Sequence, residues 1–352
     1  MTTHIALDAM GGDRGPDEVV SGAIQAVNES DIEVTLLGNM DRLSTALGDR
    51  SNNDRIHVLH TTEIISMDES PIRAVKKKKD SSIVVAVDLL KQGKVQAVVS
   101  AGNSGATMAA AIKGLGKLQY VSRPGILSIY PTLKKPLVMM DSGANVDCRP
   151  IHLLQFGIMA SAFSKVIFDI NEPRIGLLSI GEESSKGNTL VRKSRELLQE
   201  SHLNFIGNVE GRDAFHGDVD VIVCDGFVGN VCLKLSEGLA EAMIRMLRDE
   251  IGKTFVAKIG YMLAGQAFEN FRKKVDYTEY GGGPLLGLNG IAIICHGQSN
   301  ANAIKNALKQ AGKLVQKEVN RYILDMLKTC NYSDLETAET SPQTKTSAGT
   351  IQ

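Results

Sequence analysis

Short apolar runs alternate with longer amphipathic segments along most of the chain. The runs of strand length are Ile5–Leu7, Glu33–Leu37, His57–Leu59, Val95–Val99, Ile126–Ile129, Leu137–Met140, Ile175–Ile180, Val221–Cys224 and Ile291–Cys295. Segments long enough to form helices fall between these runs. The alternation is typical of a mostly parallel sheet that is covered by helices. We therefore predict an α/β fold.

Serine residues mark the expected starts of two helices. Ser81 and Ser82 can cap a helix that closes at Gly93, because a hydroxyl oxygen accepts from a free N–H in the first turn. In the same way, Ser299 can cap a long C-terminal helix that continues through Leu327.

The last part of the chain differs in composition from the rest. From about residue 334 the sequence is small and polar and has no apolar periodicity, so it cannot bury enough surface to become ordered. We predict a disordered tail over residues 334–352. Since no linker-like stretch interrupts residues 1–333, we expect these to form a single α/β domain that can comprise two lobes.

Composition and charge exclude some classes of function. A formal net charge of -1 argues against a nucleic-acid binder, and 5% aromatic residues without any tryptophan argue against base-stacking platforms. The five cysteines contain no Cys-x-x-Cys pair, which indicates reduced thiols. The first predicted strand begins at Ile5, with no basic and then apolar signal segment before it. No apolar run approaches membrane-spanning length. We expect a cytoplasmic protein.

Loops rich in glycine and asparagine recur at the ends of the predicted strands. They are Asp8–Gly12, Ser100–Gly105, Asp141–Asn145, Gly181–Asn188, Asp225–Asn230 and His296–Asn300. In α/β sheets, ligands bind beyond the carboxyl ends of strands, so the loops should converge on one crevice. Glycine lets backbone N–H groups approach an anion, and a following helix N-terminus favours phosphate. For any one loop, ordinary turn preference explains the composition about equally well.

Known nucleotide and hydrolase motifs do not match these loops. The chain has no Walker-type run, and the spacing of Gly102 and Gly105 differs from that of a dinucleotide fingerprint. Ser104 lies in a partial likeness of a nucleophile elbow but lacks the flanking glycine pattern. A nucleotide site and a serine hydrolase are therefore disfavoured.

Charged residues within the loops are further candidates. Lys186 can pair with phosphate or an oxyanion, although an ordinary solvated lysine is the alternative. Asp8, Asp141 and Asp225 follow strands, but more often such residues fix loops than bind metal, and we predict no metal. His296 can act as a general base or be structural.

Two segments have the character of docking surfaces. Arg73–Ser82 gathers positive charge just before a predicted helix, as either a solvated face or a site for an acidic partner. Thr254–Lys274 has apolar residues near helical spacing with basic residues around them, as in an amphipathic helix lying on a membrane. A core or dimer-interface helix explains that second pattern as well.

Specific motifs of the chain resemble those of the PlsX-type phosphate acyltransferases of bacterial phospholipid synthesis. The motifs are Ile5–Asp13, Lys79–Ser82, Ser100–Ala106, Gly187–Asn188, Cys224–Asn230 and Asp276–Gly287, and the likeness runs to about Asn331. The resemblance implies a Rossmann-like sheet similar to those of isocitrate-dehydrogenase-like and phosphotransacetylase-like proteins.

The resemblance also implies an activity. It is the reversible transfer of a fatty acyl group from the thioester of acyl carrier protein to inorganic phosphate. The acyl phosphate would pass to a membrane-bound glycerol-3-phosphate acyltransferase for phosphatidic acid synthesis. The family further implies a homodimer that associates peripherally with the membrane surface. We expect no cofactor and no nucleic-acid partner.

Within this resemblance, we expect direct attack of bound phosphate on the thioester, because no activated Ser–His or Cys–His arrangement is evident. The predicted phosphate and substrate ligands are Gly102, Asn103, Ser104, Gly105, Ser81 and Asn188. Lys186 and Asn230 are predicted to be catalytic, through stabilisation of the oxyanion.

Three other functions are left open by the residues. A phosphotransacetylase-like enzyme would use coenzyme A and short acyl chains with the same phosphate loops. A lipid-responsive binding protein would bind ligand without consuming phosphate. A dehydrogenase is suggested by fold alone and lacks its fingerprint.

Overall fold

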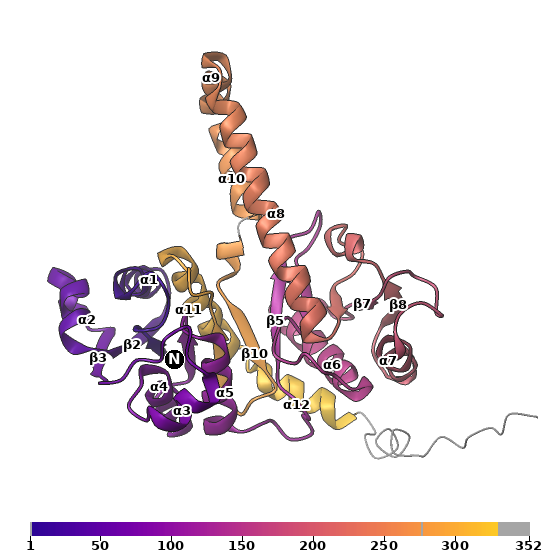
Figure 1. Cartoon of the computed structure of the whole chain (residues 1–352), viewed down its shortest axis with the longest axis horizontal. Helices are drawn as coiled ribbons and strands as arrows, with labels where there is room; N and C mark the ends of the chain where they lie inside the picture. Colours follow the sequence, from indigo (N-terminus) through magenta and orange to yellow (C-terminus); the bar gives the residue numbers. More distant parts are fainter. Residues whose placement is uncertain (1, 276, 330–352) are drawn as a thin grey trace, which may run out of the picture.

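The structure, a computed structural model, describes residues 2–275 and 277–329 and contains one continuous sheet (Figure 1). The strands are β1 Thr3–Asp8, β2 Ile32–Gly38, β3 Ile56–His60, β4 Ala97–Ser100, β5 Gly125–Tyr130, β6 Leu137–Met140, β7 Ile175–Leu178, β8 Phe205–Val209, β9 Val221–Val223, β10 Gly283–Leu286 and β11 Ile291–Ile294. The α-helices are α1 Pro16–Glu29, α2 Met40–Leu47, α3 Pro71–Lys77, α4 Ser82–Lys91, α5 Ser104–Leu115, α6 Pro150–Ile167, α7 Thr189–Glu200, α8 Gly226–Gly252, α9 Phe255–Leu263, α10 Gly265–Val275, α11 Ala301–Gln316 and α12 Val319–Thr329. The short 3-10 helices are η1 Gly48–Asn52, η2 Gly211–Phe215 and η3 Tyr277–Tyr280. The tail predicted over 334–352 lies outside the described residues.

The sheet has two halves that meet at β10. Its order is β3-β2-β1-β4-β11-β10-β5-β6-β9-β7-β8, and seven of the ten pairings are parallel, which confirms the mostly parallel α/β fold. β10 is antiparallel to β11 and β5, and β5 is antiparallel to β6. The strands β6, β9, β7 and β8 of the second half therefore run opposite to the strands of the first half, β3 to β11.

The apolar pattern did not predict β8 and β10. β10 is four residues long, begins at a glycine and contains Pro284, which cannot donate a ladder hydrogen bond. β8 lies at the edge of the sheet, where Phe205 and Ile206 are not fully buried. Both strands form because their neighbours pair with them, and that information is not local to their sequence.

The predicted helix boundaries are partly right. α4 begins at Ser82, as expected, with Ser81 at the N-cap position, but the predicted capping by a serine hydroxyl is wrong, because the Ser81 side chain makes no cap hydrogen bond and the Ser82 hydroxyl donates to Asp8. The C-terminal segment departs from the prediction in two ways. Its N-cap is Asn300, whose side chain accepts from the N–H of Ala303, and not Ser299. The segment is also two helices, because Glu318 has a φ of 49°, a left-handed conformation that ends α11 before α12 begins.

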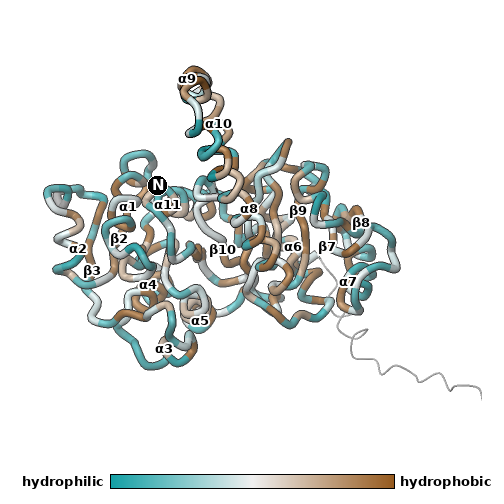
Figure 2. The backbone as a smooth tube through the Cα atoms, turned by 45° about the horizontal axis from the view of Figure 1, so that its top comes forward, coloured by the Kyte–Doolittle hydropathy of each residue, from teal (hydrophilic) through white to brown (hydrophobic). Residues whose placement is uncertain are grey.

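α8, α9 and α10 form an arm that extends away from the sheet (Figure 1). The predicted single helix over Thr254–Lys274 is wrong, because the chain turns at Ala264 between α9 and α10. α9 is strongly apolar at the end of the arm (Figure 2), yet neither α9 nor α10 contains a buried residue. A core helix within one copy of the chain is thus excluded.

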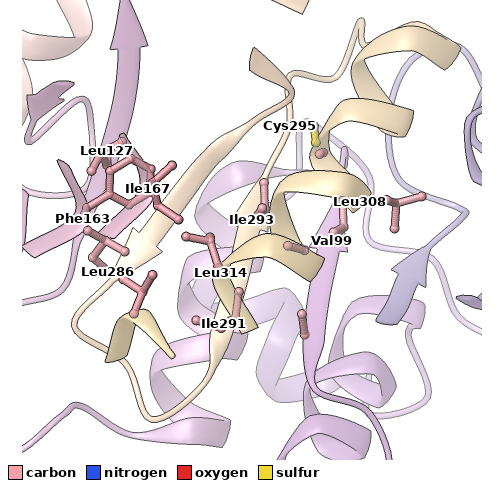
Figure 3. Close-up of a cluster of buried hydrophobic side chains, with 14 of the residues drawn as sticks. Val99, Leu127, Phe163, Ile167, Leu286, Ile291, Ile293, Cys295, Leu308 and Leu314 are labelled. Atoms are coloured by element: carbon pink, nitrogen blue, oxygen red, sulfur yellow. The ribbon is translucent and has the colours of Figure 1, made fainter. Parts of the chain in front are cut away.

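The junction between the two halves of the sheet is buried in the main hydrophobic core. Leu286 of β10 belongs to the same cluster as Leu127 of β5 and Phe163 of α6 on one side, and Ile293 of β11 on the other (Figure 3). Apolar packing therefore joins the two halves in addition to the strand pairs that β10 makes with β11 and β5.

α6 is the central helix of the second half. Contrary to the sequence expectation, it is long and apolar enough to span a membrane by length and composition, the only such helix among the described residues. In the structure, 89% of its residues are buried inside the protein. Its apolar character is therefore explained by the core.

Burial of a histidine in α6 predicts a pH dependence of stability. The pKa of His152 lies at about 4, because burial, followed by the charges of Arg123 and Arg149, disfavours the imidazolium. The unfolded chain takes up this proton near pH 6.5, so stability is complete above that value and is lost as the pH falls toward 4. We expect a loss of about 1–3 kcal/mol, measured as the free energy of urea unfolding across this range.

The matched variant is His152→Gln, which keeps a polar side chain but does not titrate. Its unfolding free energy should vary less with pH over the same interval. An equal slope for the variant and the unchanged chain would contradict this assignment.

Candidate active site

The loops after β1, β4 and β11 pack against one another, and we call them the first loop cluster (residues 8–13, 100–105 and 295–299). The N–H of Asp13 donates to the carbonyl of Gly297 at 2.7 Å. A Cβ at Gly11 would lie 2.5 Å from Cα of Gly102, so only glycine permits this backbone contact. The glycines of two loops thus bring their backbones together.

Asp8 organises the first loop cluster. One carboxylate oxygen accepts from Ser82 Oγ at 2.6 Å and from the N–H groups of Met10 and Gly11. The other accepts from Ser100 Oγ at 2.7 Å. Both oxygens are engaged and the residue is buried, so Asp8 fixes the loops rather than offering a metal ligand.

The first turn of α5 is the open part of this cluster. Asn103 is the N-cap: its Oδ1 accepts from the N–H of Ala106, and its Nδ2 donates to the carbonyls of Met67 and Glu69. The side chain of Asn103 is therefore used within the protein. Ser104 is exposed and Gly105 is half-buried, at positions where helix N–H groups lack an intrahelical acceptor and attract anions.

The predicted ligand Ser81 lies behind this surface. It is fully buried and its hydroxyl donates to the carbonyl of Lys78 at 2.9 Å. The neighbouring Ser82 makes the contact to Asp8. Ser81 and Ser82 thus position the start of α4 beside the loops.

The loops after β6 and β9 form a second loop cluster (residues 141–145 and 224–230). Asp141 is fully buried and accepts from the N–H groups of Ile126, Gly143, Ala144 and Asn145, and from Asn145 Nδ2. Burial raises the pKa of Asp141, and the hydrogen bonds oppose that shift. Its part in the second cluster resembles that of Asp8 in the first.

α8 begins in the second loop cluster. Asp225 is its N-cap and accepts from the N–H of Val228 at 2.9 Å, so its carboxylate caps the helix. Asn230 is exposed in the first turn, and its Oδ1 would lie 3.5 Å from a Cβ placed on Gly143. Asn230 therefore stands beside the loop that Asp141 holds.

A polar stripe on α8, made of Asn230, Lys234 and Glu237, leads from the second cluster to the first. These residues are four and three positions apart and share one helix face. Lys234 Nζ lies 3.1 Å from His296 Nδ1 and 2.9 Å from Glu237 Oε2. Glu237 Oε1 lies 2.8 Å from His296 Nε2. α8 follows β9 of the second half and contacts His296, which follows β11 of the first half, so it links the two loop clusters.

These contacts define the chemistry of the polar stripe. Burial would raise the pKa of Glu237, but the hydrogen bond and charge of His296, with those of Lys234, lower it overall. Both ring nitrogens of His296 are engaged, so a proton transfer would have to displace Lys234 or Glu237. The sequence reasoning did not select Lys234 or Glu237; the signal was their spacing on the helix that follows the Asp225–Asn230 loop.

Lys186 and Asn188 lie in the loop after β7, the strand beside β9. Asn188 is the N-cap of α7 and accepts from the N–H of Val191 at 2.9 Å. Lys186 is exposed, and its Cγ would lie 3.0 Å from a Cβ on Gly181. Since β7 and β9 are parallel neighbours, Lys186 and Asn230 follow strand ends on the same edge of the sheet.

The thiols near these loops are poor nucleophiles. Burial raises the pKa of Cys148 to about 11 and that of Cys295 to about 12. Burial also raises the pKa of Cys224 and Cys232. Among the described residues, these cysteines remain protonated near neutral pH, which disfavours a thiolate nucleophile.

The structure thus brings most of the predicted residues together in two loop clusters. The six loops do not form one continuous contact with each other. Asp8, Ser81, Gly102, Ser104 and His296 gather around the first cluster. A second set, made of Asp141, Asp225 and Asn230, lies at the start of α8, with Lys186 and Asn188 after the adjacent strand. The arrangement can hold an anion and present cations and amides beside it.

Comparisons with known proteins agree with this picture. Residues 3–322 match the family model described as fatty acid synthesis protein. The chain is 53% identical over 325 residues to a phosphate acyltransferase of Geotalea uraniireducens, covering 92% of this chain and 94% of that protein. It is 50% identical over 327 residues to one of Geobacter sulfurreducens, covering 93% and 94%.

A solved structure supports the fold independently. The phosphotransacetylase from Streptococcus pyogenes superposes with a TM-score of 0.59 at 18% identity, covering 90% of this chain and 94% of the other. At that identity, the likeness concerns the fold alone.

Proposed function

Because the chain belongs to the phosphate acyltransferase family of fatty acid synthesis proteins, we propose that it transfers a long acyl group from acyl carrier protein to inorganic phosphate. The product is an acyl phosphate, which a membrane-bound glycerol-3-phosphate acyltransferase would consume. The reaction needs no cofactor, since the thioester itself supplies the activated acyl group.

The observation that carries this proposal is the open first turn of α5 within the first loop cluster. Ser104 is exposed and Gly105 is half-buried there, in the first helical turn, where backbone N–H groups lack an intrahelical acceptor and can bind a small anion. Lys234 brings a positive charge to the first loop cluster through its contact with His296. A phosphate dianion is the acceptor that suits such a site.

The proposed reaction is a single displacement at the thioester. A phosphate oxygen attacks the carbonyl carbon, the tetrahedral oxyanion collapses, the C–S bond breaks, and the carrier thiolate leaves and takes up a proton. Lys186 and Asn230 stabilise the oxyanion. The raised pKa values of the thiols support direct attack over a cysteine intermediate.

Trapping of the product tests this function. Acyl carrier protein bearing a long acyl chain is incubated with the enzyme, with and without phosphate, and any acyl phosphate is converted to the hydroxamate with hydroxylamine. Hydroxamate that depends on both phosphate and enzyme is expected. Turnover of acetyl coenzyme A but not of the carrier substrate would instead favour the phosphotransacetylase alternative.

The carrier protein is expected to dock on the basic surface around α3. Arg73, Lys76 and Lys77 are exposed on α3. Lys79 contacts Lys113 of α5, and this contact, together with the repulsion between them, lowers the pKa of Lys113. An acidic partner would relieve the repulsion, and the surface adjoins the start of α4 at the first loop cluster.

The stem of the arm is expected to pair with a second copy of the chain. Leu235, Leu239, Met243 and Met246 form an exposed apolar stripe, with Leu235 71% and Leu239 59% exposed. This stripe lies on roughly the opposite face of α8 from the polar stripe, at about 100° per residue. A second copy would remove this apolar surface from water.

Aspartate at both Leu235 and Leu239 is expected to convert the dimer to a monomer, because pairing would bury two uncompensated charges. Sedimentation equilibrium measures the change. A variant that sediments like the unchanged protein would exclude the stem as the dimer contact.

The tip of the arm is expected to bind the membrane surface. Met262 and Leu263 are 71% and 80% exposed, and Lys253, Lys258 and Arg272 are basic residues nearby. Apolar residues beside cations favour the interface of anionic lipid. Cytoplasmic location with peripheral membrane association follows as a proposal.

Glutamate at both Met262 and Leu263 is expected to abolish flotation with vesicles containing phosphatidylglycerol, while hydroxamate formation from soluble carrier substrate persists. The stem and tip variants serve as controls for each other. Loss of the dimer in the tip variant, with vesicle binding retained, would assign the tip to the dimer interface instead.

A further inference from the structure

Three potential metal ligands meet on adjacent strands of the first half of the sheet, away from the loop clusters. His4, Glu33 and His57 come from β1, β2 and β3. His4 lies beside Glu33 in the register, and His57 lies beside Thr35. Their ligand atoms all lie within 4.8 Å of one another.

The three side chains lie close together, but their ligand atoms are farther apart than they would be around a bound ion. His57 Nε2 is 3.7 Å from Glu33 Oε2, too long for a hydrogen bond. The rings of His4 and His57 meet edge to face with centroids 5.4 Å apart. Bonds of about 2 Å around one ion place ligand atoms roughly 3.3 Å apart. Small rotations of the exposed His57 and Glu33 side chains would therefore close the set.

The backbone and a neighbouring hydroxyl already orient the ligands. Parallel ladders fix the three strands, so the side chains project from one face at adjacent positions. Thr35 Oγ1 lies 2.7 Å from Nε2 of His4 and restrains its ring. Such outer contacts commonly orient histidine ligands in metal sites.

We propose that His4, Glu33 and His57 bind one divalent transition-metal ion, with Zn²⁺ the best fit. Two imidazoles and a carboxylate form a ligand set that zinc takes, with water in the remaining position. Asp8 lies four residues beyond His4, about 13 Å along the strand, so the ion would not contact the first loop cluster. Its effect would be to hold β1, β2 and β3 together.

Cobalt binding to the full-length protein tests the proposal. After chelator treatment, Co²⁺ is added and the visible absorption bands of the bound ion are followed. We expect saturation at one ion per chain, with Zn²⁺ displacing Co²⁺. At free Zn²⁺ of 100 times Kd, the folding equilibrium constant should rise about 100-fold, seen as a higher urea midpoint.

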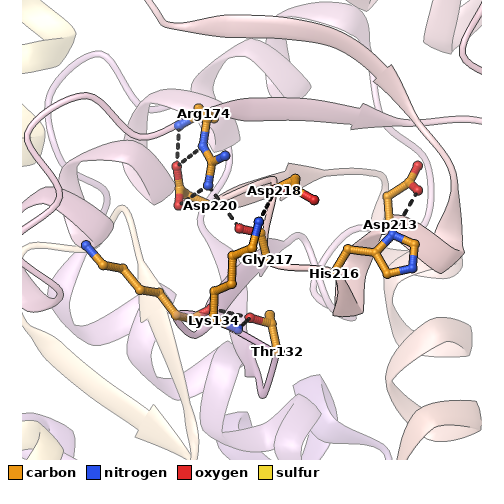
Figure 4. Close-up of polar contacts among 9 residues, drawn as sticks. Thr132, Lys134, Arg174, Asp213, His216, Gly217, Asp218 and Asp220 are labelled. Atoms are coloured by element: carbon orange, nitrogen blue, oxygen red, sulfur yellow. Dashed lines mark hydrogen bonds and ion pairs between the residues drawn. The ribbon is translucent and has the colours of Figure 1, made fainter.

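Variants of the two exposed ligands locate the ion. His57 and Glu33 side chains are 48% and 38% exposed, so His57→Ala and Glu33→Gln should fold. Each should weaken binding at least about tenfold. His216→Ala is the matched control, because His216 also stands 3.7 Å from a carboxylate, that of Asp213 (Figure 4), but the described part of the chain offers the pair no third metal ligand.

Two outcomes would overturn the proposal: absence of saturable Co²⁺ binding, and binding of unchanged affinity in His57→Ala. Hydroxamate formation is measured in the same variants and should persist. The metal site and the proposed acyl transfer can thus fail independently of each other.

Discussion

Replacing Lys186 with alanine is expected to lower kcat by about 10²–10³-fold, the usual effect of removing one donor to a developing oxyanion. Lys186 is exposed after β7, on the edge of the sheet that also carries Asn230. Because its side chain is exposed, the free energy of unfolding should stay the same. Single-turnover release of carrier thiol measures the chemical step.

Two further variants make this test specific. Lys193→Ala removes another exposed cation of the following helix, one to two turns beyond the loop, and should leave kcat unchanged. Lys186→Arg retains charge but changes the donor geometry, and should recover part of the activity. If Lys186→Ala releases thiol at the wild-type rate, the catalytic assignment is wrong.

Alanine at Gly229 is expected to destabilise the protein by about 3 kcal/mol or more, the upper range for overpacking. A Cβ there would lie 1.9 Å from the backbone oxygen of Asp141. That oxygen belongs to a loop fixed by the hydrogen bonds to the Asp141 carboxylate, so the loop cannot move away without losing them. Urea unfolding measures the loss.

Gly238→Ala is the matched control on the same helix. A Cβ at Gly238 has no neighbour within 4 Å, so alanine should stabilise the protein by about 0.5–1 kcal/mol through helix propensity alone. The two substitutions are chemically identical and should have opposite signs. A destabilisation of similar size at both sites would show that the effect comes from replacing a glycine of α8 as such, and not from the contact of the new Cβ with the oxygen of Asp141.

Local sequence patterns were sufficient for much of the fold. The long apolar runs that became β1, β2 and β6 have their side chains buried, so hydrophobicity marks them directly. β10 forms because it pairs with β11 and β5, and its glycine and proline are residues that disfavour a strand in any prediction from local sequence. The break at Glu318 is likewise invisible, because glutamate rarely adopts a positive φ.

For the candidate site, the glycines of the loops were more informative than the asparagine side chains that were predicted as ligands. The glycines were predicted to let backbone N–H groups approach an anion, and the structure shows that Gly11 and Gly102 also let two loop backbones touch. Asn103 and Asn188 were predicted as ligands, yet the structure uses both as helix caps. Spacing places Lys234 and Glu237 on one face of α8 with Asn230, but it does not show that this face meets His296, which lies 62 residues from Lys234 in the chain.

The position of β10 and β11 near the end of the chain bears on how the protein is assembled by the ribosome. β4 is complete at residue 100, but its neighbour β11 begins at residue 291, and β10 reaches β5 only from residue 283. The nascent chain thus carries two unpaired strand edges through most of its synthesis, and such edges invite pairing with other chains. Chains whose synthesis stops before residue 283 should therefore aggregate most readily and depend most on chaperones.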